Sequence, residues 1–296
     1  MSRLHVCLIC HTEGRPTHFE VGVPAMLRIR DEVEQATGKR CVLTWALGTF
    51  HESGQRAIFD EYRELFLGLL ARGDEIGLHP HGVVQDGRWT VDPFIVEDTQ
   101  RLCAAGFPRP KTFVAGVWAF YPSTLAILES QGYQVDASVV AGATRQRKED
   151  DDGNVLYDYP PSEAYPDPAL AVPYRLARDC AVRRGDSSII EVPVVGHLED
   201  LRPGGSHGAA TRFGPRRDRL ASVGTDIHEI FWHPWELLQG YESRDEEPHT
   251  IRALREFLVG VGSDPEVCIS SVYEAAMDWV QNAENKVAYK TDAGDT

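Results

Sequence analysis

The chain of 296 residues is long enough for one large domain or for two small ones. Hydrophobic residues make up 42% and charged residues 25%, which is ordinary for a soluble globular protein and excludes a disordered or fibrous chain. The net charge of −15 argues against a nucleic-acid partner, because affinity for a phosphate backbone comes from Lys and Arg. Sugars and other small molecules remain open as ligands.

Short apolar runs alternate with helical patterns along the chain. The pattern predicts helices over 24–38, 56–73, 94–106, 122–132, 251–262 and 271–283. It predicts strands over 6–9, 41–47, 75–78, 112–116, 135–140, 189–195, 229–232 and 267–270. Seven or eight strands alternating with helices favour one α/β domain over residues 1–283, a barrel of seven or eight βα units with parallel strands. Residues 284–296 are predicted to form a polar C-terminal tail.

The alternation is interrupted by a long excursion over residues 144–188. It carries charges over 145–152 and then five prolines among aromatic residues over 157–174. Aromatic-rich loops commonly bind ligands, so we expect this excursion to lie near a site. Further on, His197, His207 and the glycine-rich segment 203–205 are interpreted as a mobile loop.

The chain also carries indications of its cellular location. No segment approaches eighteen consecutive apolar residues, so no membrane span is expected, and the short N-terminal apolar run lacks a signal-peptide cleavage site. The six cysteines are scattered and several stand in apolar runs, which indicates buried free thiols and a reducing cytoplasm. Cys7 and Cys10 have CxxC spacing but fall within the first strand, so a structural role is favoured over a metal or redox role.

Imidazole and carboxylate side chains follow several of the predicted strands. His79 and His81 stand at the end of one strand, His11 and Glu13 follow the first, and His233 ends a late apolar run. Two imidazoles two positions apart face the same side of an extended backbone, which suits a shared metal ion. Active sites of βα barrels lie at the carboxyl ends of the strands, so we expect these side chains to converge.

Each of these residues also has a structural interpretation. His79 and His81 could be one buried histidine bonded to the backbone and one solvated neighbour. Glu13 could coordinate a divalent ion while His11 serves as a base or a further ligand, or the two could be exposed residues that start a loop. His233, with a carboxylate nearby, suits a general acid, and packing under neighbouring tryptophans is equally open.

Weaker candidates for substrate binding are Tyr174, Arg175, Glu191 and Trp235. Glu191 could orient Arg175 or a sugar hydroxyl, or form only a salt bridge at a strand end. The remaining histidines are predicted to be structural or solvent-facing: His5, His18, His51, His228 and His249.

In their order along the chain, these motifs resemble the polysaccharide deacetylase superfamily (NodB-homology, carbohydrate esterase family 4) over nearly the whole length. The resemblance is carried by five segments: His11-Thr12-Glu13, His79-Pro80-His81, Phe113-Val114-Ala115-Gly116 with the following 122–138, Pro173-Tyr174-Arg175 with Glu191-Val192-Pro193-Val194, and Phe231-Trp232-His233-Pro234-Trp235-Glu236.

The resemblance implies a distorted barrel and one divalent metal ion, with zinc first and cobalt, manganese or nickel as alternatives. It also implies hydrolysis of an acetamide by an aspartate base and a histidine acid. Carried over by position, Glu13 takes the place of the acidic metal ligand, His79 that of the first histidine ligand, and His233 that of the general acid. Tyr174 and Arg175 fall in the segment before the fourth motif.

Three positions depart from the family pattern. His11 stands where the family has its base, Val83 where it has a second histidine ligand, and Val114 where it has an arginine. A neutral imidazole can act as a base near pH 7, and His81 could supply the missing ligand. Alternatively His11 is itself a ligand, beside Glu13 and His79 and with or without His81.

The resulting hypothesis is a cytoplasmic metal-dependent amide hydrolase that removes an acyl group, expected to be acetyl, from an amino sugar or polysaccharide precursor. The substrate would be a nucleotide- or carrier-linked sugar or a small aminoglycoside-like molecule, and the aromatic excursion could stack on its ring. A second hypothesis is a catalytically inactive relative that binds saccharides or assists polysaccharide assembly. A third keeps the metal and hydrolyses a different amide or an ester.

Overall fold

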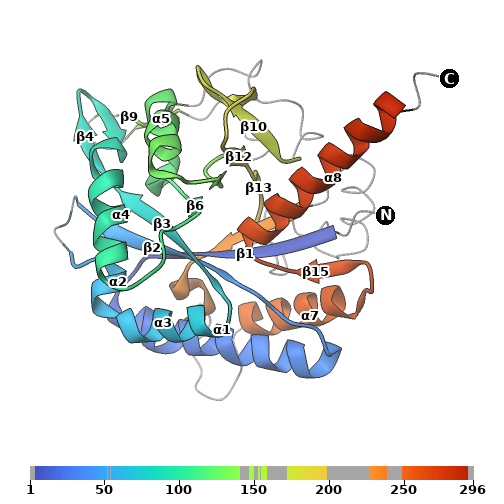
Figure 1. Cartoon of the computed structure of the whole chain (residues 1–296). Helices are drawn as coiled ribbons and strands as arrows, with labels where there is room; N and C mark the ends of the chain where they lie inside the picture. The colour runs from blue at the N-terminus through green and yellow to red at the C-terminus, as the bar shows by residue number, and fades with distance from the viewer. Residues whose placement is uncertain are drawn as a thin grey trace.

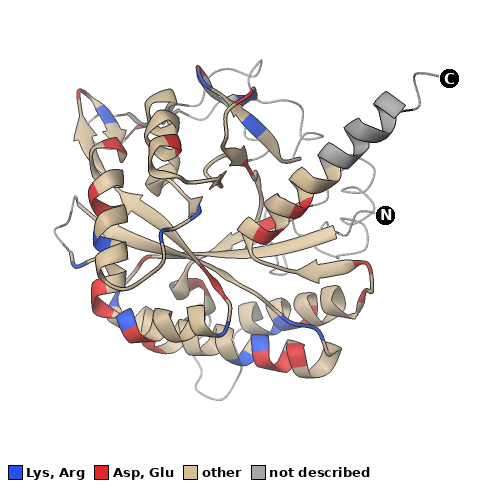
Figure 2. Cartoon of the chain, viewed as in Figure 1, with Lys and Arg blue, Asp and Glu red and all other residues tan. Residues whose placement is uncertain are grey.

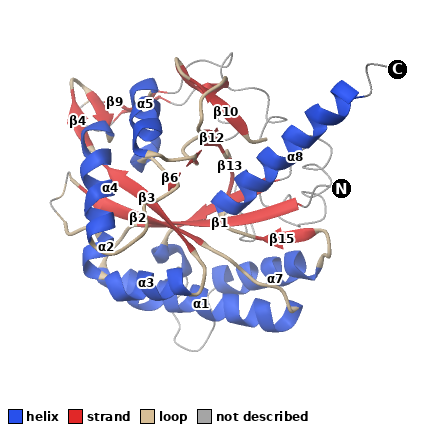
Figure 3. Ribbon diagram, viewed as in Figure 1, coloured by secondary structure: helices blue, strands red, loops and turns tan. Residues whose placement is uncertain are grey.

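A strongly curled, mainly parallel sheet forms the centre of the molecule in the computed structural model (Figures 1 and 3). Its strands run in the order β11-β10-β12-β7-β6-β3-β2-β1-β14-β13, with β15 paired to β1. An isolated parallel bridge joins Val140 to Val194, next to β7 and in β13, and so brings two distant parts of the path together. The structure describes residues 4–51, 53, 55–140, 147–149, 153, 155–158, 172–198, 227–238 and 249–292.

The strands of this sheet are β1 (Leu4–Thr12), β2 (Thr44–Phe50), β3 (Glu75–His81), β6 (Thr112–Phe113), β7 (Val135–Asp136), β10 (Tyr174–Ala177), β11 (Cys180–Arg184), β12 (Ile190–Glu191), β13 (Val194–His197), β14 (Ile227–Trp232) and β15 (Val267–Ile269). A small second sheet holds β4 (Val83–Gln85), β5 (Arg88–Thr90), β8 (Arg147–Glu149) and β9 (Val155–Asp158).

The α-helices are α1 (Pro16–Thr37), α2 (Ile58–Glu61), α3 (Arg63–Ala71), α4 (Ile95–Ala104), α5 (Pro122–Gln131), α7 (His249–Ser263) and α8 (Val272–Asp292). Short 3-10 turns are η1 (Asp92–Phe94), η2 (Gly116–Trp118) and η5 (Pro234–Leu238). None of the helices within the described ranges is both long enough and apolar enough to cross a membrane.

Both faces of the central strands are buried, as in the parallel sheets of α/β proteins. On β1, Leu8 and Cys10 pack into the larger core cluster, which lies between the sheet and helices α1, α3 and α7. Cys7 and Ile9 belong to a second cluster on the inner face of the curled sheet. Helix α8 adds apolar side chains to that inner cluster, and α1, α3 and α7 lie together below the sheet (Figure 1). Charged residues of both signs occur along these helices (Figure 2).

The predicted α/β barrel is confirmed as a distorted barrel, and so is the burial of Cys7, Cys10 and Cys41 as free thiols. Because Cys7 and Cys10 lie in different core clusters on opposite faces of β1, they do not form a redox pair.

Several predicted boundaries were wrong. Helix α1 begins at Pro16 and not at Pro24. Both prolines suit the first position of a helix, and only the packing of residues 16–23 decides between them. The predicted helix 56–73 is interrupted at Tyr62, and β7 covers two residues instead of 135–140. The last helix continues to Asp292, through most of the predicted tail, because this segment is rich in good helix formers.

The excursion over 144–188 contains strands that its charges and prolines did not predict. Strands β8 and β9 join the small sheet, and β10 and β11 extend the edge of the main sheet as an antiparallel pair. Residues 159–171, with most of the excursion's prolines, and the glycine-rich segment 203–205 lie outside the described residues.

Helix α1 approaches the segment after His233 closely enough to require a glycine. A Cβ atom built on Gly22 would lie 2.2 Å from the carbonyl oxygen of Pro234, the first residue of η5. Backbone oxygen cannot rotate away, so this contact fixes where η5 lies against α1.

We expect Gly22→Ala to lower the free energy of unfolding by about 1–3 kcal/mol, because the added methyl group overpacks this contact. Gly68→Ala is the matched control, since Gly68 is also helical and nothing lies within 4 Å of its Cβ position. It should gain roughly 1 kcal/mol from helix propensity alone. Urea denaturation measures both, and an equal gain in the two variants would contradict the packing assignment.

Candidate functional site

Five of the predicted site residues meet at the carboxyl ends of β1, β3 and β14. The parallel register places His79 of β3 beside Gly48 of β2, and His11 of β1 beside Ala46. The three strands are far apart in the sequence. The side chains brought together are those of His11, Glu13, His79, His81 and His233.

The tightest group consists of Glu13, His79 and His81. Glu13 Oε1 lies 2.8 Å from His79 Nε2 and 2.9 Å from His81 Nε2, and the two Nε2 atoms are 3.2 Å apart. His79 and His81 lie within β3, which continues past the predicted end at Leu78 to His81. The side chains therefore project from one face of a strand, as their spacing predicted.

A backbone hydrogen bond sets the orientation of His79. Its Nδ1 donates to the carbonyl oxygen of Val114 at 3.1 Å, so the second nitrogen, Nε2, faces Glu13. The side chain of Val114 itself belongs to the inner apolar cluster. Val114 therefore contacts His79 through its backbone, whereas its side chain packs in the core.

The charges of this group fit a bound cation. Burial lowers the pKa of His79, although its contact with Glu13 opposes the shift. Burial alone would raise the pKa of Glu13, but the contacts with His79 and His81 outweigh it and hold that pKa well below its usual value. The two shifts favour an unprotonated imidazole and an ionised carboxylate, which are the forms that bind a divalent cation.

His11 lies beside this group, buried and neutral. Its ring stacks on His79 with centroids 4.5 Å apart and on Phe231 at 5.2 Å. Burial holds the pKa of His11 well below its ordinary value. Nε2 of His11 is buried and has no hydrogen-bond partner among the described residues. An unpartnered nitrogen at this place can bind a metal ion or accept a proton.

The turn η2 covers His11 with an indole ring. Trp118 contacts His11 edge-on, with centroids 5.2 Å apart. Val117 and Trp118 both have left-handed backbone conformations, with φ of 48° and 59°, which is costly for residues other than glycine. The preceding Gly116 allows close approach, since a Cβ there would lie 2.5 Å from the carbonyl oxygen of Pro80. Strained backbone is thus retained where it closes the site.

A buried carboxylate orients His233. Glu236 Oε1 accepts from His233 Nδ1 at 2.7 Å, and its Oε2 accepts from the His233 backbone N–H at 3.2 Å. His233 Nε2 is then directed towards Glu13, 3.7 Å from Oε1. The ring also stacks on Trp235, with centroids 4.1 Å apart. His233 therefore has both of the features predicted for it. It lies beside a carboxylate, as a general acid would, and it packs against a tryptophan.

His197 lies at the site, although it was predicted to lie in a mobile loop. It ends β13, and its Nε2 donates to Glu236 Oε1 at 2.6 Å. Burial would raise the pKa of Glu236, but the hydrogen bonds from His197 and His233 outweigh it and lower that pKa. The alternation of residues 194–197 could have extended the strand to His197, but no spacing reveals a contact with Glu236. His207 lies outside the described residues.

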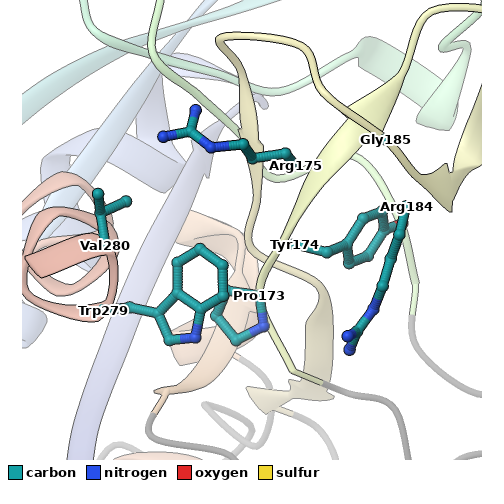
Figure 4. A pocket seen from close by; sticks show the side chains of 7 residues that line it. All are labelled: Pro173, Tyr174, Arg175, Arg184, Gly185, Trp279 and Val280. Carbon is teal, nitrogen blue, oxygen red and sulfur yellow. The ribbon is translucent and has the colours of Figure 1, made fainter. Parts of the chain in front are cut away.

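Of the predicted substrate-binding residues, Trp235 lies at the site. Tyr174 and Arg175 line a different cavity of about 280 Å³, against Trp279 of α8 (Figure 4). Arg175 donates to the carbonyl oxygens of Ser187 and Ser188 rather than to Glu191.

Glu191 forms a buried pair with Asp136, its register partner on β7. Both side chains are fully buried, and Glu191 Oε1 accepts from the backbone N–H of Val139 at 3.0 Å. Burial and the charge of Asp136 raise the pKa of Glu191 well above its usual value, and burial raises the pKa of Asp136 to about 6. The raised pKa values favour a protonated carboxyl in this buried pair.

Comparison with known structures places this site on an established fold. A protein from Mycobacterium smegmatis classed as a polysaccharide deacetylase aligns over 95% of this chain and 92% of its own, with 18% identity and a TM-score of 0.57. The 4-alpha-glucanotransferase of Thermococcus litoralis aligns over 93% of this chain and 40% of its own, with 14% identity and a TM-score of 0.52. No family model matches the chain, and neither does any protein of curated function.

The chain therefore has the distorted barrel fold of the polysaccharide deacetylases, at the low identity expected of a divergent sequence. The same fold supports a glucanotransferase, so the fold alone does not determine the reaction. The reaction must instead be inferred from the side chains of the site.

The Asp136–Glu191 pair predicts a specific dependence of stability on pH. Because the pKa of Asp136 is raised in the folded state, its contribution is present below pH 4 and is lost as the pH rises through about 6. Asp136→Asn removes this loss, so the variant should gain on the order of 2 kcal/mol relative to the parent between pH 4.5 and 7.5. Urea denaturation at the two pH values tests this. The exposed Asp186→Asn is the control, and a stability difference for Asp136→Asn that does not change with pH would contradict the raised pKa of Asp136.

Proposed function

We propose that this protein is a metal-dependent amide hydrolase that removes an N-acyl group, most simply acetyl, from an amino sugar or polysaccharide precursor. The observation that carries the proposal is the convergence of Glu13, His79 and His81 on one point. That point lies at the carboxyl ends of the strands of a deacetylase-type barrel.

The metal ion would be held by Glu13 Oε1, His79 Nε2 and His81 Nε2. Two histidines and one glutamate form a ligand set used by catalytic zinc sites, which leave a position open for water and substrate. Zinc suits this mixture of nitrogen and oxygen donors, with cobalt, manganese and nickel as alternatives. When bound, the ion would polarise the amide carbonyl and make water a better nucleophile.

The neighbouring histidines would handle protons. Nε2 of His11, neutral and without a protein partner, is available to accept one. His233 has its Nδ1 committed to Glu236, so its Nε2 is the atom that can exchange a proton with the departing amine. Trp235, stacked on His233, offers an aromatic surface to a sugar ring. A cytoplasmic location stays a prediction that accords with the buried free thiols.

One observation favours the alternative of an inactive saccharide-binding protein. The contacts of His11 are made with rings: His79, Phe231, Trp118 and His233. No charged partner among the described residues orients His11, and Val114 stands where the family's arginine would. If His11 cannot act as a base, the fold would bind saccharide without turning it over.

Metal content separates the proposed centre from an accidental cluster. Purified protein should bind about one zinc ion per chain, and His79→Ala should lose it, because two of the three short contacts involve His79. His51→Gln is the matched control, because the His51 ring bonds Asp98 and the substitution leaves unchanged its backbone N–H, which donates to the carbonyl oxygen of His81. This variant should keep the metal. Elemental analysis is combined with release of acetate from N-acetylated amino sugars. Metal without turnover would favour the binding protein, and no metal would contradict the centre itself.

Replacing Glu236 tests the role of His233 separately from the metal. Glu236→Gln retains the shape but removes the charge that holds both His233 and His197. Turnover should fall roughly 10- to 100-fold while metal content stays at the parent level. Steady-state kinetics with elemental analysis gives both quantities. Loss of the metal together with activity would show that His233 belongs to the ligand set.

A further inference from the structure

A second cavity, of about 240 Å³, lies directly beside the candidate metal centre. It opens between the start of α1 and the segment that leads into α2, and one wall begins at Gly14, the residue after Glu13. A Cβ on Gly14 would lie 3.2 Å from the ring of Trp235, which itself stacks on His233. The cavity and the metal centre therefore share a wall. Its volume corresponds to about eight water molecules, enough for a bulky polar group.

One side of this cavity is apolar and held in place from two elements. Phe19 of α1 and Tyr62, between α2 and α3, stack with ring centroids 4.8 Å apart. Phe19 is buried, Tyr62 is half-buried, and Ile58 completes the surface. Aromatic and aliphatic walls of this kind pack against the apolar face of a sugar ring.

The other side carries two arginines, from separate segments of the chain. Arg15 precedes α1 and Arg56 precedes α2; both side chains are exposed and line the cavity. Neither has an ion pair within the described ranges, whereas Arg101 nearby in the fold is paired with Asp60. Glu61 is the one acidic residue among the described lining residues. In a chain of net charge −15, two unpaired guanidinium groups at one cavity are positioned to attract an anion.

We propose that this cavity binds an anionic group of the substrate, a phosphate or a carboxylate, so that the amino sugar is an acidic one. Guanidinium groups hold both anions through paired hydrogen bonds. The sugar ring would lie against Phe19 and Tyr62, with its acylamino group directed past Gly14 to the metal centre. The direction of the acylamino group rests on the proposed function, whereas the binding of the anion rests on the cavity alone.

Binding of three matched sugars tests the inference. Titration calorimetry compares N-acetylglucosamine, N-acetylglucosamine 1-phosphate and N-acetylmuramic acid, which are neutral, phosphorylated and carboxylated. At least one acidic sugar should bind roughly tenfold tighter than the neutral one, and the preferred acid identifies the anion. In the double variant Arg15→Gln, Arg56→Gln this preference should disappear, so that the three sugars bind about equally.

Arg28→Gln is the matched control, because Arg28 is an exposed arginine on the same helix but does not line the cavity. It should keep the preference. Equal binding of the three sugars, no binding of any, or a preference that survives in the double variant would overturn the proposal. The titrations are done on protein treated with chelator, so a chain that lacks metal or turnover can still show the anion preference.

Discussion

One oxygen atom of Glu13, in contact with two imidazole nitrogens, is the interaction on which the rest of the site depends. Nδ1 of His79 donates a hydrogen bond to the backbone carbonyl of Val114, which directs Nε2 towards the Glu13 carboxylate. A carboxylate oxygen and two imidazole nitrogens within 3.2 Å of one another are donor atoms that a divalent cation can bind together. The arrangement therefore favours binding of a positive ion at the place where the chemistry would occur.

The architecture keeps this arrangement in place. Parallel register between β1, β2 and β3 sets Glu13 against the two histidines, and the close contact of Gly22 with Pro234 sets the segment that carries His233 and Glu236. Glu236 in turn holds His233 and His197 through one oxygen. Two carboxylates thus organise four imidazoles, one at the metal centre and one behind the proposed acid. Strain in η2 is retained where it covers His11.

The sequence was informative where a local pattern determines geometry. The alternation of seven or eight strands with helices predicted the barrel. The period of two along a strand predicted the shared direction of His79 and His81. Contacts between distant segments could not be predicted: the bond from His197 to Glu236, the carbonyl of Val114 on His79, and the pairing of Asp136 with Glu191. Each of these contacts joins residues that are distant in the sequence and depends on how the strands are paired. No local pattern around these residues indicates that pairing. The same limit applies to Tyr174 and Arg175, which line a different cavity.

Anomalous X-ray diffraction from crystals grown with zinc would show whether Glu13, His79 and His81 form a metal centre. We expect one strong peak about 2.0–2.2 Å from Glu13 Oε1 and from both Nε2 atoms, with an open position facing His11 and His233. A protein with no peak there would contradict it. So would an ion held instead by His197, His233 and Glu236.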